Sequence, residues 1–136
     1  MINCSIKIFI LLFFLAKVCT AQDSINDKTQ KDEIVYVVDK KPKYPGGLKK
    51  LSQFIIENYV YPAQANEKGI EGVIYVSIEI ASDGKVENAK VVKDLGDNTG
   101  EEALRVASIM PNWTPAVKKG KNVRSITYFP IKLAFD

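Results

Sequence analysis

The chain of 136 residues contains no histidine, and its two cysteines, Cys4 and Cys19, both lie near the N-terminus. Histidine and cysteine supply most zinc ligands in proteins, and they supply the base or nucleophile of Cys-His and Ser-His enzymes. Carboxylates do not replace them here, because the adjacent Glu101 and Glu102 do not face each other on a helix as a glycosidase pair must. We therefore predict no enzyme activity, no catalytic residue, no metal site and no cofactor.

A long hydrophobic run is also missing. The apolar stretch at residues 8–16 is shorter than the ~20 residues that a membrane-spanning helix needs. It follows a basic residue and leads to a Cys-Thr-Ala triplet at 19–21, a pattern typical of a secretory signal peptide cleaved after residue 21. Two alternatives stay open: the segment is retained as an inner-membrane anchor, or Cys19 is lipidated.

An excess of one charge is absent as well. The chain has 19 basic and 16 acidic residues, and removal of residues 1–21 with Lys7 and Lys17 lowers the net charge from +3 to +1. A nearly neutral exported protein has no electrostatic basis for binding nucleic acid. We expect a signal peptide over 1–21, a flexible tether with a short extended segment over 22–40, and one domain over 41–136.

Hydrophobic periodicity predicts the first half of this domain. Apolar residues at Leu48, Leu51 and Tyr59, with Phe54 or Ile55 between them, predict an amphipathic helix that ends before Pro62. Two strands follow, joined by a tight hairpin. The first has its apolar face at alternate positions, the hairpin contains the Asp-Gly pair at 83–84, and the second strand covers residues 86–93.

The second half predicts one more helix and one more strand. Thr99 and Glu102 have the spacing of a capping box, which starts a helix that stops at Pro111. The last strand alternates from residue 123 onward, and Pro130 within it indicates an edge strand, because proline has no N–H to donate. The predicted fold is therefore α+β, a three-stranded antiparallel sheet with two main helices packed on one face. The lone Trp113 is expected to pack against the sheet.

Several short motifs occur in one order and together resemble the C-terminal domain of TonB-type energy transducers, over roughly residues 44–135. The motifs are Tyr44-Pro45-Gly46-Gly47, Gly69-Ile70-Glu71-Gly72, Asp83-Gly84, Glu102-Ala103-Leu104-Arg105-Val106, Met110-Pro111-Asn112-Trp113-Thr114-Pro115 and Gly120-Lys121-Asn122-Val123.

This resemblance implies a periplasmic module that docks to outer-membrane TonB-dependent receptors. Such a domain captures a short receptor segment, the TonB box, as a strand added beside its own last strand, and an ExbB–ExbD inner-membrane complex supplies the force. The resemblance implies that Tyr61 and Pro62 lie near the captured strand. Arg124, Ile126 and Tyr128 share the less apolar face of the last strand, where they either contact a partner or a second copy or are covered by residues 34–38.

The chain also departs from a complete transducer. It has no histidine, and a tether of about 20 residues reaches at most about 70 Å. An alternative function is therefore a stand-alone envelope interaction module, which self-associates or binds peptidoglycan or a regulator without transducing energy.

Overall fold

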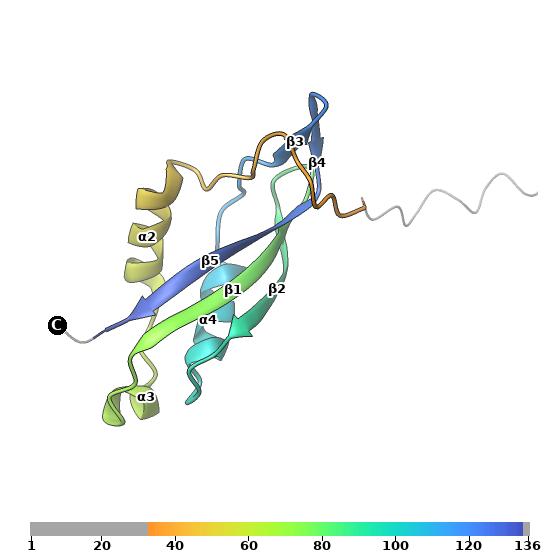
Figure 1. Ribbon diagram of the computed structural model, residues 1–136. Helices are drawn as coiled ribbons and strands as arrows, with labels where there is room; N and C mark the ends of the chain where they lie inside the picture. The colour runs from red at the N-terminus through yellow and green to blue at the C-terminus, as the bar shows by residue number, and fades with distance from the viewer. Residues whose placement is uncertain (1–32, 135–136) are drawn as a thin grey trace, which may run out of the picture. The chain divides into compact units, whose positions relative to one another are not determined.

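The computed structural model describes residues 33–134 of the chain. The predicted signal peptide at 1–21 and the predicted tether up to residue 32 lie outside the described residues. Within the described part, no helix has the length and apolar character needed to cross a bilayer. The elements, shown in Figure 1, are α2 (Gly47–Asn58), α3 (Ala63–Glu67), β1 (Gly72–Ile80), β2 (Val86–Lys93), α4 (Thr99–Ser108), β3 (Ala116–Lys118), β4 (Lys121–Val123) and β5 (Ser125–Leu133).

The main sheet has three antiparallel strands in the order β2-β1-β5. β5 pairs with β1 along its whole length, from Gly72 opposite Leu133 to Ile80 opposite Ser125. β3 and β4 form a separate short hairpin. The predicted α+β fold is confirmed, and β5 lies at a sheet edge, as Pro130 predicts.

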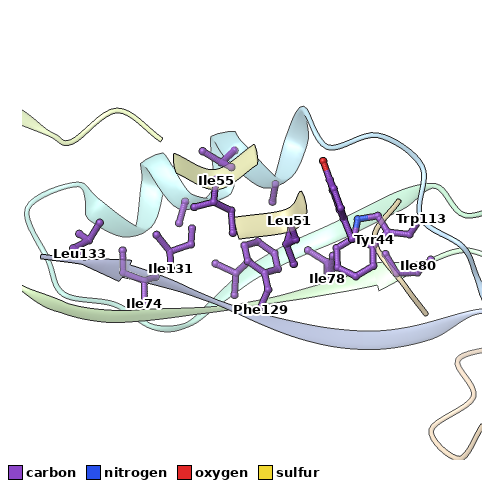
Figure 2. Packing of buried hydrophobic residues seen from close by; sticks show 14 residues of the cluster. Tyr44, Leu51, Ile55, Ile74, Ile78, Ile80, Trp113, Phe129, Ile131 and Leu133 are labelled. Atoms are coloured by element: carbon purple, nitrogen blue, oxygen red, sulfur yellow. The ribbon is translucent and has the colours of Figure 1, made fainter. Parts of the chain in front are cut away.

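The core fills the space between one face of the sheet and the helices. Phe129 and Ile131 of β5 are at most 2% exposed, and Leu51 and Ile55 of α2 point toward them (Figure 2). α4 contributes its own buried apolar stripe and packs on β1 and β2. Each large apolar side chain that is fully buried contributes about 1.5–3 kcal/mol to folding, so this layer supplies most of the stability.

The β1–β2 hairpin is attached to the segment that follows α4. The backbone N–H of Trp113 donates to the carbonyl of Gly84 over 2.7 Å. A Cβ atom at Gly84 would lie 2.1 Å from the carbonyl oxygen of Trp113. Gly84 also has φ +90°, which only glycine adopts without strain. Trp113 is buried with its ring edge-on to Tyr44 at 5.5 Å (Figure 2), which confirms its predicted packing.

Two local expectations are wrong. Leu48 is 80% exposed, because it lies on a flank of α2 that no described element covers. Thr99 is not the N-cap of α4 but its first residue; Asn98 takes the cap position without a side-chain hydrogen bond. Asp94 takes the place of the expected capping box, since its carboxylate accepts bonds from the Thr99 hydroxyl and from the Gly100 amide in the first turn of α4.

Candidate partner-binding edge

The outer side of β5 presents unpaired backbone groups. The carbonyl of Arg124 points away from β1, because it accepts the N–H of Val35 over 2.8 Å. Backbone groups of alternate residues in a strand point to the same side. The backbone N–H and carbonyl groups on this open side therefore belong to Ile126, Tyr128, Pro130 (carbonyl only) and Lys132. Proline is tolerated at position 130 for the same reason, since its missing N–H is not required by β1.

The segment before α2 touches this edge at one point. Val35 makes the bond to Arg124, but residues farther along pair with β3 instead. The amides of Asp39 and Lys40 both donate to the backbone carbonyl of Val117, at 2.8 and 3.0 Å. Farther along, Lys43 exchanges two backbone bonds with Thr114. Among residues 33–134, the edge from Ile126 to Lys132 makes no further backbone bond on its open side.

Two of the predicted site residues lie on this open stretch. Tyr128 is 63% exposed and stands opposite Ser77 of β1, while Ile126 is half-buried opposite Glu79. Their side chains share the sheet face that bears no helix in the described part of the chain. Tyr75, opposite Pro130, adds a second exposed aromatic ring to this face, and sequence analysis missed it. The sequence pattern that could have identified Tyr75 is its alternation with Ser77 and Glu79 on the less apolar face of β1.

Arg124 has a different environment, because its side chain is only 4% exposed. Its guanidinium pairs with Glu79 of β1 and, through Nη1 at 2.7 Å, with Glu87 of β2. Burial lowers the pKa of Arg124, but the hydrogen bonds to the two glutamates outweigh it and raise the pKa above the ordinary value. The charge is thus neutralised inside the protein, and Arg124 joins the beginning of β5 to both other strands of the sheet.

Tyr61 and Pro62 lie at the other end of β5. The Tyr61 hydroxyl donates to the carbonyl of Ile70, two residues before Gly72 of β1, which is the partner of Leu133. Pro62 precedes α3 and is half-buried. The structure therefore does not bring these two residues together with Ile126 and Tyr128; they flank opposite ends of the same strand.

An ion pair fixes the segment that leads to Tyr61. The amide of Val60 donates to Glu102 of α4 over 2.8 Å, and Arg105 donates to the same carboxylate. The bonds from Arg105 lower the pKa of Glu102, and the Val60 amide adds to this against the effect of burial. Glu102 thus holds the α2–α3 connection instead of forming a capping box or an acid pair.

Metal-ligating side chains do not cluster in the described part of the chain. Between residues 33 and 134, no group of three or more cysteine, aspartate or glutamate side chains converges as metal ligands must. The arrangement that remains is an open strand edge with exposed side chains beside it, which is suited to binding an extended peptide.

Comparison with known proteins agrees with this geometry. A family model described as "Gram-negative bacterial TonB protein C-terminal" matches residues 57–134. None of the curated proteins matches the chain.

The solved structures that are similar to it include three of TonB C-terminal domains. Two solution NMR structures of the Helicobacter pylori TonB C-terminal domain are each 30% identical to it; they cover 63% and 65% of this chain and 90% and 81% of their own, with TM-scores of 0.41 and 0.44. A Pseudomonas aeruginosa TonB C-terminal domain is 28% identical over 57% of this chain and 80% of its own, with a TM-score of 0.40. On the strength of the family match, the chain belongs to the family of TonB C-terminal domains, which are protein-interaction modules of the Gram-negative envelope.

Proposed function

We propose that this chain is a periplasmic docking module for outer-membrane TonB-dependent receptors. It binds a receptor segment, the TonB box, as a strand added to the open side of β5, and it takes part in energy-coupled transport across the outer membrane. One observation carries this proposal: the unpaired backbone row from Ile126 to Lys132, in a chain of the TonB C-terminal family.

The energetics of strand addition suit such a role. The open side offers N–H groups at Ile126, Tyr128 and Lys132, and each hydrogen bond to a partner strand contributes about 0.5–1.5 kcal/mol net. Side chains beside the bonds add selectivity, and Ile126 and Tyr128 are placed to do so. Force applied along the strand loads these bonds together, which makes the joint resistant to pulling.

The other predicted site residues receive supporting roles in the proposal. Arg124 positions the start of the edge through its pairs with Glu79 and Glu87. Tyr61 and Pro62 lie where a strand longer than the open stretch would leave the edge, near the end of β5. If the N-terminal segment is retained as an anchor, an ExbB/ExbD-type complex is the second partner and supplies the force.

An NMR titration of the full chain with a synthetic TonB-box peptide tests the proposal. We expect amide shifts at Ile126, Tyr128 and Lys132. Amides of β2, the opposite edge of the sheet, serve as the internal control and should not move. A titration that leaves residues 123–129 unperturbed contradicts the proposal.

The same open edge supports a second candidate function. Two copies of the chain paired through β5 would form a homodimer, and a stand-alone interaction module without energy transduction would use the edge in this way, or for a regulator or peptidoglycan. Crosslinking in cells separates the two functions. Recovery of a receptor, ExbB or ExbD supports docking, and recovery of the chain itself alone supports the stand-alone module.

A further inference from the structure

An exposed apolar flank on α2 is not explained by the fold. Leu48 and Ile56 are 80% and 79% exposed, and Ser52 lies between them at four-residue spacing. Residues spaced by four lie one above the other on a helix, so the three form a continuous strip about 12 Å long. We call Leu48, Ser52 and Ile56 the α2 flank.

The α2 flank faces the open side of β5. The buried side of α2 is set by Leu51 and Ile55, which lie over Phe129 and Ile131 of β5 (Figure 2). On a helical projection, Phe54 lies to one side of this pair and the α2 flank lies to the other.

The Phe54 side is turned toward the interior. Phe54 packs on Tyr44, which contacts the buried Trp113. α4 packs on β1 and β2, whereas Leu51 and Ile55 of α2 pack with the β5 side chains, so the side of α2 opposite Phe54 is directed outward, beyond the edge strand (Figures 1 and 2).

Resting on the proposed function, we propose that the α2 flank and the edge of β5 together form one binding site. This site binds an extended peptide that has apolar side chains at every second position. A strand added to β5 lies about 4.8 Å beyond it, and its alternate side chains point to the helix-bearing face. Those side chains reach Leu48 and Ile56. Since alternate residues of a strand are about 7 Å apart, the flank accommodates two of them.

Two features favour an extended partner segment over other occupants. The amide of Val35 donates one backbone bond to the carbonyl of Arg124, directly before β5, so the open side at the start of this edge is accessible to a chain segment. The chain's own tether at 22–32 has one large apolar residue, Ile25, so it does not supply the required alternation. The α2 flank lies before residue 57, where the matched family region begins.

Two lysine-capped peptides of equal length test the inference with the full chain. One alternates valine with threonine, and the other alternates serine with threonine. We expect both to shift the amides of Ile126 and Tyr128, and the valine peptide to bind about tenfold more tightly because its side chains cover the α2 flank. The double substitution Leu48→Ser and Ile56→Ser should abolish this preference without changing the affinity of the serine peptide.

Val92→Ser is the matched control, because Val92 is 60% exposed on β2, away from the edge. It should leave both affinities unchanged, and dispersed amide spectra of all variants show that they are folded. A valine preference that survives Leu48→Ser and Ile56→Ser overturns the inference but leaves the docking edge intact. Failure of both peptides to shift the β5 amides overturns the docking edge as well. If the double substitution instead weakens self-association and leaves the peptide preference, the flank serves a second copy and the inference is wrong.

Discussion

Replacing Tyr128 with proline should weaken receptor binding while leaving the fold intact. The N–H of Tyr128 points away from β1, so proline removes a donor that the described part of the fold does not use. Pro130, two residues along the same strand, already shows that this side of β5 tolerates proline. The preceding Thr127 is extended, as a residue before proline must be.

Tyr128→Ala isolates the contribution of the hydrogen bond, since it removes the same side chain but keeps the N–H. One net hydrogen bond is about 0.5–1.5 kcal/mol, so Tyr128→Pro should bind a TonB-box peptide about 2–12-fold more weakly than Tyr128→Ala. Isothermal titration calorimetry measures both affinities, and urea unfolding should place the two variants within about 1 kcal/mol of each other.

Thr127→Pro provides the opposite control, because the Thr127 N–H is directed to β1 and its loss should destabilise the sheet strongly. Equal peptide affinities for Tyr128→Pro and Tyr128→Ala would mean that the backbone N–H of Tyr128 does not bind the partner.

Three further predictions concern the scaffold that holds this edge. Arg124→Leu should lower the free energy of unfolding by about 3–5 kcal/mol, because it leaves partly buried glutamates without their cation; a urea-unfolding loss under 1 kcal/mol would contradict this. Gly84→Ala should cost at least about 2 kcal/mol, since its Cβ meets the Trp113 carbonyl and φ is positive; an unchanged melting temperature would contradict the close approach. For Asp94, burial raises the pKa, but bonds from Gly96, Thr99 and neighbouring amides outweigh it and lower the pKa. Its contribution to stability is thus complete above the unfolded pKa of about 4 and is lost as pH falls through the lower folded pKa. Asp94→Asn should flatten the decrease in stability below about pH 4 in acid unfolding, and an identical pH profile would argue against this role.

The sequence predicts the sheet well because each strand carries its own signal. Alternation along β1 and β5 assigns their buried faces without any knowledge of the partner strand. Pro130 identifies the edge, because only an outward-facing position tolerates a missing donor. These signals are local, and local signals depend little on the rest of the fold.

Features that depend on long-range contacts are less predictable. Leu48 has the spacing of a buried residue, but it is exposed because no described element covers its flank of α2. Arg124 alternates with Ile126 in sequence, yet it is buried because the register of three strands brings Glu79 and Glu87 to its guanidinium. Asp94 lies five residues before Thr99 and accepts bonds from the Thr99 hydroxyl and the Gly100 amide at the start of α4, a spacing outside the usual capping pattern.

Amide hydrogen exchange of the full chain, with and without a TonB-box peptide, shows whether the open side of β5 binds the peptide backbone. The amides of Thr127 and Phe129 already face β1 and should keep the protection they have in the free protein. We expect the bound peptide to slow exchange at Ile126, Tyr128 and Lys132. Unchanged exchange at these three amides, or new protection along β2 instead, would contradict it.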